Sequence, residues 1–451
     1  MDYFVLGGRP FLSRFPPHIP GIFNPNRFPY DQVDPALNSQ AGQVGAAAPQ
    51  CPRPEDAGPG GDGGPRGPVA PEVDYFAYLG GSPPRTQGNQ LPEDVDDIDI
   101  DPQPGQVKSA QAGNSAQAEP VKAPAALHRG FNANEVQAWD AGRFELVRKI
   151  QDATRNRGQV HLMRDSAHDT LVAVKQMPNR WIRTCHSEFV MEHPSETEMP
   201  WQDVGCIRFL HNAGYSHVCE LLGVYRDDSS TYVVTSFATE GDLFSWCEAG
   251  VPPGREREVL VQPLARQIMQ GVMQLHDYSI VHRDLSLENI LMSKLPGDGS
   301  LQILIIDFSM ASTLRRFRKC VRGKASYQAP ELHSEEEYDA YLTDAFSLGV
   351  TLYAVLLKDY PWLSTRPGGC KCFEYVKKHG FRSYLNKRKL RTSSQRVVEF
   401  MSEPLIQLLE GLLELDPAKR LTLGESSWTA DGQPRRSVWD MPWMHDGPGP
   451  G

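Results

Sequence analysis

Three polar residues near the middle of the chain are of types that could act together on a charged ligand. Asp284 and Asn289 lie in the otherwise largely apolar segment 281–291, and Asp307 follows further along. A carboxylate can accept the proton of a hydroxyl group. An amide oxygen and a second carboxylate are the hard ligands that magnesium prefers. The alternative is that these side chains only cap turns.

Four short motifs stand in a fixed order around these residues. Residues 281–291 read VHRDLSLENIL, and the motifs VAVK, DFS and APE occupy 172–175, 307–309 and 329–331. Together they resemble the catalytic loop, the third-strand lysine, the D-F-G triplet and the A-P-E triplet of eukaryotic protein kinases. Four ordered motifs are far more specific than one, and the resemblance covers about two thirds of the chain.

The resemblance implies a role for each residue in phosphoryl transfer from ATP. Asp284 would orient the substrate hydroxyl and take its proton, and Lys175 would hold the α- and β-phosphates. Asn289 and Asp307 would bind Mg²⁺ between them. The implied reaction is transfer of the γ-phosphate to Ser or Thr of protein substrates. The tyrosine-kinase pattern before the asparagine is not matched.

The nucleotide-covering loop departs from the family pattern. Of the glycine-rich motif only Gly158 and Val160 survive within 153–160. Without the other glycines the backbone cannot approach phosphates as closely. Arg155 and Arg157 could supply cations instead, or could point to solvent. By resemblance, the other nucleotide contacts are Ala173, Thr235, Ser236, Ala238, Asp242 and Leu291.

Lys175 also requires an acidic partner from the small-lobe helix. The string DVGCIRFL at 203–210 has the apolar spacing of that helix and nominates Asp203, one methylene shorter than the family's glutamate. Glu196 and Glu198 are competitors. The chain between Lys175 and Asp203 is longer than usual, which predicts an insertion around residues 194–200.

A second departure concerns the cation beside the catalytic aspartate. Ser286 stands where serine/threonine kinases usually carry lysine, and Lys324 stands where they usually carry threonine. In the family both positions adjoin the catalytic aspartate. We therefore hypothesise an exchange in which Lys324 supplies the cation that Ser286 cannot. The alternative is a solvated surface lysine.

The segment from Asp307 to Glu331 is expected to be the activation segment. Six basic residues and no acid lie between Arg315 and Lys324, and Cys320 occupies the place of the usual activating threonine. A phosphothreonine switch paired to Arg283 is therefore not expected. An acidic partner, or the acidic run at 94–101 of this chain, could order the segment, although charge runs are usually solvated. The remaining candidate phosphorylation sites are Ser312, Thr313, Ser326 and Tyr327.

The pattern of elements predicts an α+β, two-lobed kinase fold. Short runs rich in β-branched and aromatic residues predict strands at 144–150, 160–163, 171–177 and 232–237, whereas 259–278 has helical spacing. We predict a kinase domain over 139–425, with a small lobe at 139–237 and a large lobe at 238–425, followed by a tail at 426–451. Asp344, Glu331 and Arg420 match structural positions of the large lobe.

Residues 1–138 form a Pro- and Gly-rich extension with an acidic run at 93–101, and few apolar residues recur in it at regular spacing. Such composition predicts disorder. The string DYFVLGG at 2–8 returns as DYFAYLGG at 74–81. This echo is either a docking motif, for a partner or for the kinase domain, or a chance duplication or remnant of local repeat expansion.

Composition narrows the compartment and the partners. The net charge of −10 argues against a dedicated nucleic-acid binder. A secretory signal, N-myristoylation and a membrane-spanning helix are not expected, and the run 346–357 reads as a buried core helix. The eight cysteines form no CxxC pair, which favours reduced thiols in a soluble cytoplasmic or nuclear protein.

Two functions from different classes follow. The first is a serine/threonine kinase; Glu288 and Asp242 resemble acidic positions that bind an upstream arginine in basophilic kinases, which implies substrates with such an arginine. The second is a pseudokinase scaffold that binds partners without turnover. The poor glycine loop, Ser286 and Ser309 favour the second; the intact Lys175 and Asp284 favour the first.

Overall fold

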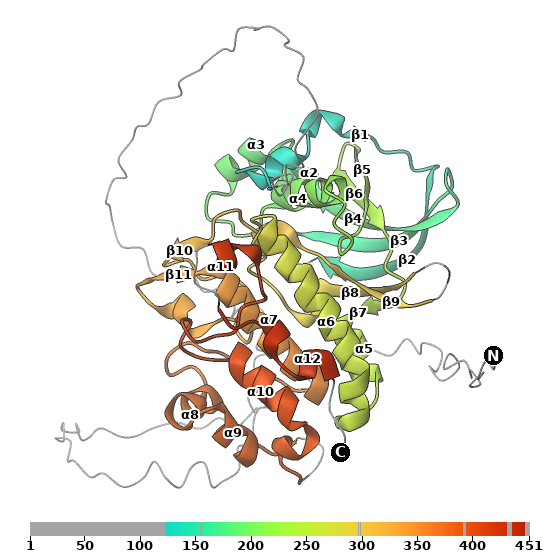
Figure 1. Ribbon diagram of the computed structural model, residues 1–451. Coiled ribbons are helices and arrows are strands. Elements are labelled where there is room, and N and C mark those ends of the chain that lie inside the picture. Colours follow the sequence, from blue (N-terminus) through green and yellow to red (C-terminus); the bar gives the residue numbers. More distant parts are fainter. Residues whose placement is uncertain are drawn as a thin grey trace, which may run out of the picture. The chain divides into compact units, whose positions relative to one another are not determined.

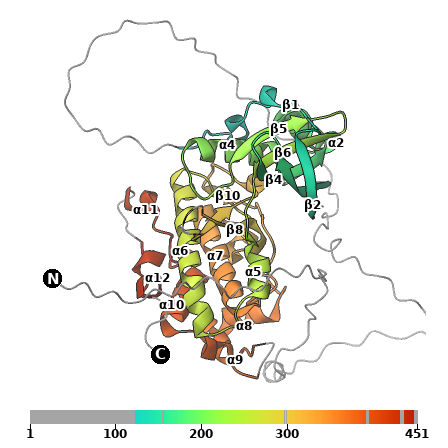
Figure 2. The ribbon, with the colours of Figure 1, turned by 90° about the vertical axis from the view of Figure 1, so that its right-hand side faces the viewer.

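The computed structural model describes residues 122–446, apart from 154–155, 296, 298, 391–393 and 431–434. The DYF echo, the acidic run at 93–101 and Arg155 therefore lie outside the described residues, as does most of the predicted extension 1–138. The described chain contains a sheet-rich part and a helix-rich part, shown in Figures 1 and 2. The predicted α+β fold with a β-rich small lobe and a helical large lobe is confirmed.

The small lobe is built on one six-stranded sheet in the order β1-β5-β6-β4-β3-β2. All neighbours are antiparallel except β1 and β5. Buried residues alternate along β4, where Val172 and Val174 are inaccessible, so one face of the sheet carries a core. The strands are β1 (Gln137–Ala138), β2 (Phe144–Ala153), β3 (Gly158–Asp165), β4 (Thr170–Pro178), β5 (Leu221–Arg226) and β6 (Ser230–Ser236).

The helix α4 (Pro200–Asn212) is the long helix of the small lobe. Proline occupies its first turn, where a missing N–H costs nothing. The longer connection expected before this helix contains two short helices, α2 (Asn179–Ile182) and α3 (His186–Glu192). Trp201 of α4 donates its ring N–H to the carbonyl of Ile182 at 2.8 Å, which ties this connection to α4.

The large lobe is organised around α7 (Ala340–Leu357), beside which α5 and α6 run in Figure 2. α7 is apolar and long enough to cross a membrane, but 94% of that window is buried inside the protein, as a core helix requires. The other helices are α5 (Leu243–Ala249), α6 (Arg255–Asp277), α8 (Lys371–His379), α9 (Phe381–Lys387), α10 (Glu403–Leu412), α11 (Ser426–Ala430) and α12 (Trp443–Asp446). There are two small sheets. One has the order β7 (Gly241–Asp242), β8 (Ile290–Lys294) and β9 (Leu301–Ile305), and the other pairs β10 (Arg316–Arg318) with β11 (Glu337–Asp339).

The folded part of the chain extends beyond both boundaries drawn from the sequence. On the N-terminal side, the 3₁₀ turn η2 (Leu127–Gly130) packs on α4, with Leu127 buried. On the C-terminal side, Trp443 of α12 is inaccessible and donates its ring N–H to Glu258 of α6 at 2.8 Å. The folded part therefore begins before residue 139, and the segment after residue 425 joins the core of the large lobe.

An ion pair braces the large lobe from within. Nη2 of Arg420 lies 3.0 Å from Oε2 of Glu331, and the Arg420 side chain is inaccessible while that of Glu331 is 11% exposed. Arg420 also donates to the carbonyl of Leu342 at 2.9 Å. The pair thus joins the end of the activation segment to α7.

Glu331→Ala is expected to lower the free energy of unfolding by about 3–5 kcal/mol, because it leaves a buried guanidinium without its counter-charge. Urea titration followed by circular dichroism measures this change. Glu335→Ala is the matched control, since its pair with Lys319 is exposed on both sides and should change the value by less than about 0.5 kcal/mol. Equal effects of the two substitutions would contradict the assignment.

Candidate active site

The carboxylate of Asp203 links two elements at the centre of the site. Its Oδ2 lies 3.5 Å from Nζ of Lys175 on β4, and its Oδ1 accepts the backbone N–H of Phe308 at 2.9 Å. Asp203 is on the first turn of α4 and is 7% exposed. Of its competitors, Glu196 accepts N–H groups within its own loop, and Glu198 accepts from Asn156 at 3.4 Å. The structure therefore brings Lys175, Asp203 and the DFS triplet together.

The charges around Lys175 are predominantly negative. Burial by itself would lower the pKa of this lysine, but the charges of Asp203, Asp307 and Glu198 outweigh it and raise the pKa above its ordinary value. Burial would raise the pKa of Asp307, yet the nearby ammonium and the hydroxyl of Ser309 hold that pKa below its usual range. One ammonium thus faces three acidic groups.

The catalytic loop holds Asp284 and Asn289 against each other. Nδ2 of Asn289 donates to the carbonyl of Asp284 at 2.8 Å and to its Oδ2 at 3.3 Å. The backbone N–H of Ile306 donates to the carbonyl of Asn289 at 3.0 Å, so the loop is fixed directly beside Asp307. The Asn289 amide nitrogen is used inside the loop, and the amide oxygen is the atom that this side chain can offer a cation.

Asp307 lies in a strained backbone position. Its φ of 66° is in the left-handed region, which non-glycine residues adopt infrequently. Oγ of Ser309 donates to Oδ1 of Asp307 at 2.6 Å, and the carbonyl of Ser309 accepts the N–H of Met199 at 3.0 Å. The serine that replaces the family's glycine therefore orients the carboxylate of Asp307 and contacts the N-cap of α4.

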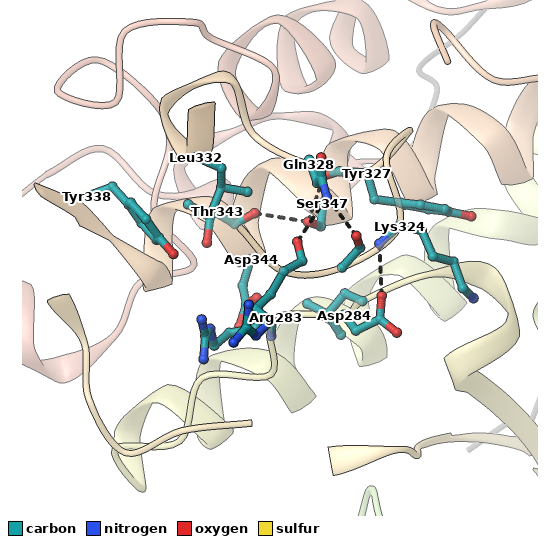
Figure 3. Close-up of a pocket in the computed structure, with 13 residues that line it drawn as sticks. Arg283, Asp284, Lys324, Tyr327, Gln328, Leu332, Tyr338, Thr343, Asp344 and Ser347 are labelled. Atoms are coloured by element: carbon teal, nitrogen blue, oxygen red, sulfur yellow. Dashed lines mark hydrogen bonds between the residues drawn. The ribbon is translucent and has the colours of Figure 1, made fainter. Parts of the chain in front are cut away.

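Lys324 reaches the catalytic loop with both its backbone and its side chain. Its N–H donates to Oδ1 of Asp284 at 3.1 Å, as Figure 3 shows. Its Nζ donates to Oγ of Ser286 at 2.7 Å and lies 3.0 Å from Oε2 of Glu288. Gly323 allows this approach, because its φ is +82° and a Cβ there would lie 2.8 Å from the carbonyl of Arg283.

Two described residues of the degenerate glycine loop, Arg157 and Gly158, pack against the small lobe. The guanidinium of Arg157 lies over the ring of Trp181, 5.3 Å from its centroid. Gly158 packs so closely on the carbonyl of Gln176 that a side chain would collide with it. This ring contact differs from both alternatives predicted from the sequence, in which Arg157 supplies a cation to the phosphates or points to solvent.

The predicted adenine-side residues come from two sheets. Ala173 pairs with Thr235 across β4 and β6, next to Ser236, and Val160 pairs with Lys175 across β3 and β4. Leu291 of β8 packs in one cluster with Ala238. Asp242 caps α5, because its carboxylate accepts the N–H of Ser245 at 2.7 Å and its hydroxyl at 3.1 Å. If Asp242 binds a ligand, its carboxylate must contact that ligand while it also caps α5.

The activation segment makes contacts that the sequence did not indicate. The guanidinium of Arg283 lies 3.9 Å from the ring centroid of Phe317 and donates to Sγ of Cys320 at 3.0 Å. The basic run is partly neutralised within the chain, because Arg315 and Arg316 both pair with Asp339 on the facing strand β11. The phosphothreonine partner of Arg283 is thus replaced here by an aromatic ring and a thiol.

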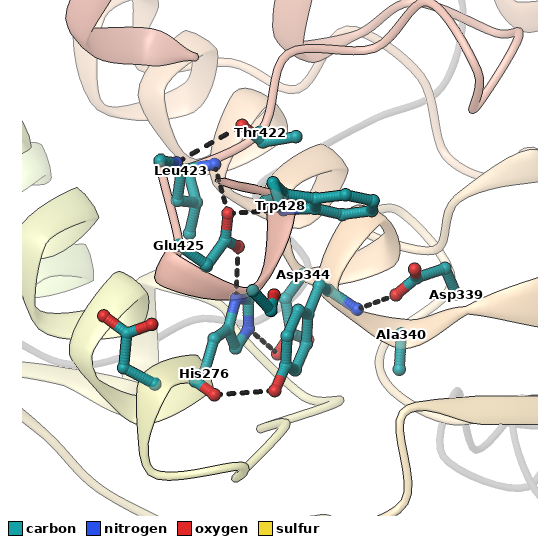
Figure 4. A network of polar contacts seen from close by, with 12 residues as sticks. His276, Asp339, Ala340, Asp344, Thr422, Leu423, Glu425 and Trp428 are labelled. Atoms are coloured by element: carbon teal, nitrogen blue, oxygen red, sulfur yellow. Dashed lines mark hydrogen bonds and ion pairs between the residues drawn. The ribbon is translucent and has the colours of Figure 1, made fainter. Parts of the chain in front are cut away.

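A buried charged network anchors the catalytic loop, and Figure 4 shows three of its members, His276, Asp344 and Glu425. Asp344 of α7 accepts the N–H groups of His282 and Arg283 at 2.8 and 2.9 Å. His276 lies between Asp344 and Glu425, at 3.1 and 2.7 Å. Burial would lower the pKa of His276, but the two carboxylates raise it to about 9. Sequence reasoning found Asp344 and missed His276 and Glu425; the only signal was a histidine at an apolar position of α6.

This network makes a pH-dependent contribution to stability. Because the pKa of His276 is raised on folding from about 6.5 to about 9, its contribution is complete below pH 6.5 and is lost as the pH rises through 9. For this group the loss is on the order of 3 kcal/mol. In Glu425→Gln the fall should be smaller and should end at lower pH, because one of the two carboxylates is absent.

Urea unfolding at steps from pH 6 to pH 10 measures both proteins, with the exposed Glu145→Gln as the control. Identical pH profiles for the wild type and Glu425→Gln would show that His276 is not held as an imidazolium.

Comparison with known proteins agrees with this arrangement. A protein kinase domain is matched over residues 156–430, and the chain belongs to the protein kinase family. Among similar proteins, serine/threonine-protein kinase SAPK5 of Oryza sativa subsp. japonica is 33% identical over 286 residues, 63% of this chain and 68% of that protein. The expected class, serine/threonine protein kinase, is thereby confirmed at the level of the family.

Two further relatives match a smaller part of this chain. Serine/threonine-protein kinase SRK2A of Physcomitrium patens is 31% identical over 49% of this chain and 58% of its own length. The serine/threonine-protein kinase SIK3 homolog of Danio rerio is 30% identical over 49% of this chain, which spans only 17% of that protein. The likeness to these two is therefore confined to part of each protein.

Proposed function

We propose that this protein transfers the γ-phosphate of ATP to serine or threonine hydroxyls of protein substrates. The observation that carries the proposal is the chain of contacts from Lys175 through Asp203 to Phe308, which lies beside Asp307 and the catalytic loop. Phosphoryl transfer depends on positioning and on charge neutralisation. Both requirements can be met by these side chains, which contact one another in the structure.

The residues present fit a magnesium ion. Three acidic groups face the ammonium of Lys175. The side-chain amide oxygen of Asn289 can also bind a cation, because its amide nitrogen is the atom used within the loop. When bound between Asp307 and Asn289, Mg²⁺ would neutralise charge on the phosphate oxygens. Among the described residues no three His, Cys, Asp or Glu side chains could hold a metal by themselves. This suits magnesium, which is commonly held by one or two carboxylates together with substrate phosphates.

Asp284 is oriented for the substrate hydroxyl. One carboxylate oxygen accepts from the Asn289 amide at 3.3 Å and the other from the Lys324 N–H at 3.1 Å. These two contacts hold the carboxylate in one orientation, from which it can accept the proton of the attacking hydroxyl. Lys175 binds phosphate oxygens, and Asp203 keeps its ammonium in place.

Lys324 supplies the cation that Ser286 lacks. Nζ of Lys324 donates to Oγ of Ser286 at 2.7 Å. Residue 286 is the position from which the family's lysine side chain would extend. From this place the ammonium of Lys324 can neutralise charge on the transferred phosphoryl group. Glu288 now holds Lys324 at 3.0 Å, and a substrate arginine bound to Glu288 would compete for the same carboxylate. The proposed substrates therefore include proteins with an arginine upstream of the target residue, bound by Glu288.

Turnover of ATP with magnesium tests the function directly. The full-length chain should phosphorylate a generic basic protein on serine or threonine, and Asp284→Asn should lower kcat by at least about 100-fold, since general base and orientation are both lost. Phosphoamino-acid analysis with labelled ATP identifies the product. A wild-type rate no higher than that of Asp284→Asn, with ATP still bound, would instead support the pseudokinase scaffold.

The exchange of the lysine is tested by restoring the family's arrangement. Lys324→Ala should lower kcat by about 10- to 100-fold, the range for loss of one electrostatic donor. Lys319→Ala is the matched control, because it removes a lysine of the same segment whose pair with Glu335 is exposed. The double variant Ser286→Lys with Lys324→Thr should recover activity that Lys324→Thr loses. If Lys324→Ala behaves like Lys319→Ala, the exchange is wrong.

A further inference from the structure

Residues 122–131, which precede the sheet, form a strap between three elements of the site; this segment is called the strap below. Its turn η2 packs along α4, the helix that carries Asp203. It also contacts the end of α6 and the activation segment, and the ring of His128 stacks on His186 of α3 with centroids 3.8 Å apart. We propose that the strap positions α4, and through α4 the carboxylate of Asp203, for catalysis. This inference rests on the proposed function.

The contact between the strap and α4 is backbone against backbone. A Cβ at Gly205 would collide with the carbonyl of Leu127, and a Cβ at Gly130 would collide with the carbonyl of Gly205. The two glycines remove the side chains that would otherwise separate the segments. Glycine is the least favourable ordinary residue inside a helix after proline. Gly205 therefore weakens α4 by itself and allows the strap to approach.

Side chains of the strap complete the contact. Leu127 and Phe131 are 2% and 6% exposed and belong to the main core cluster. The ring of Phe131 stacks on Trp201 with centroids 6.4 Å apart, and the guanidinium of Arg208 lies 5.6 Å from the Phe131 ring. Both partners are on α4, at either side of Gly205. The strap therefore contacts α4 along two turns of the helix.

The other contacts of the strap lie outside α4. The N–H of Ala123 donates to the carbonyl of Tyr278, at the end of α6, at 2.9 Å. Oγ1 of Thr313 donates to the carbonyl of Ala125 at 2.8 Å, and Thr313 lies just after the DFS triplet. The strap thus ties α4 to the large lobe and to the start of the activation segment at once.

The position of α4 matters because three of its contacts reach the DFS segment. The N–H of Met199 donates to the carbonyl of Ser309 at 3.0 Å, Gln202 donates its side-chain N–H to the carbonyl of Ala311, and Asp203 accepts from Phe308. In many kinases activation-loop phosphorylation controls the position of this helix. Here Cys320 takes the threonine's place, and the strap provides an alternative restraint within the same chain.

The test uses Gly205→Ala in the full-length protein. Alanine has a higher helix propensity than glycine. If Gly205 affected only the helix itself, α4 in Gly205→Ala would therefore be as ordered as in the wild type or more so. The strap model predicts the opposite, because the methyl group displaces Leu127. A misplacement of about 1 Å can cost about 100-fold in rate, so kcat/KM should fall by at least about tenfold, with a higher KM for ATP. Amide hydrogen exchange of α4 should become faster, while that of α6 is unchanged.

Gly130→Ala should give the same result from the strap side without altering α4. Gly142→Ala is the control, because the nearest atom is a side-chain oxygen of Asp140 at 3.2 Å. If both alanine variants fail to fold, Thr313→Val decides: it removes one hydrogen bond and should lower kcat/KM by about fivefold.

Wild-type activity and wild-type α4 exchange in Gly205→Ala and Gly130→Ala would overturn the proposal. If the wild type does not turn over ATP, the proposed function fails, while the exchange rates of α4 still decide whether the strap positions the helix.

Discussion

The carboxylate of Asp203 is the point at which the sheet of the small lobe meets the DFS triplet. One of its oxygens lies beside the ammonium of Lys175 on the sheet, and the other accepts the N–H of Phe308. A carboxylate so deeply buried is costly unless both oxygens are satisfied. The sheet, α4 and the DFS triplet must therefore take their places together, and the short reach of aspartate narrows the permitted position of α4.

The large lobe meets the same requirement with a different charge arrangement. Asp344 fixes the catalytic loop through two backbone N–H groups, and the imidazolium of His276 compensates the charges of Asp344 and Glu425. Removing any one member would leave a buried charge without its partner. The loop that carries Asp284 is thus held by the network from α6, α7 and the segment after residue 420, and also by Lys324 of the activation segment.

Much of this arrangement could be predicted from the sequence because it depends on local patterns. Runs of β-branched residues identified β2, β3, β4 and β6, and the catalytic loop motif identified the residues around Asp284. The strand β5 was missed, since Gly223 interrupts it and lies under the ring of Tyr225. The turn η2 was missed because residues 122–130 carry little periodicity, and their burial comes from a helix far along the chain. The same holds for Glu425, which meets His276 across 149 positions.

The inaccessible Trp443 has a practical consequence for how this domain is delimited. The family match ends at residue 430, yet Trp443 fills space beside α6 and satisfies the buried carboxylate of Glu258. A shortened protein that stopped at the family boundary would lose both a large aromatic side chain and a hydrogen-bond donor from its interior, and a cavity and a lost hydrogen bond to a buried carboxylate are each destabilising. Recombinant fragments of this kinase should therefore retain the chain through at least Asp446.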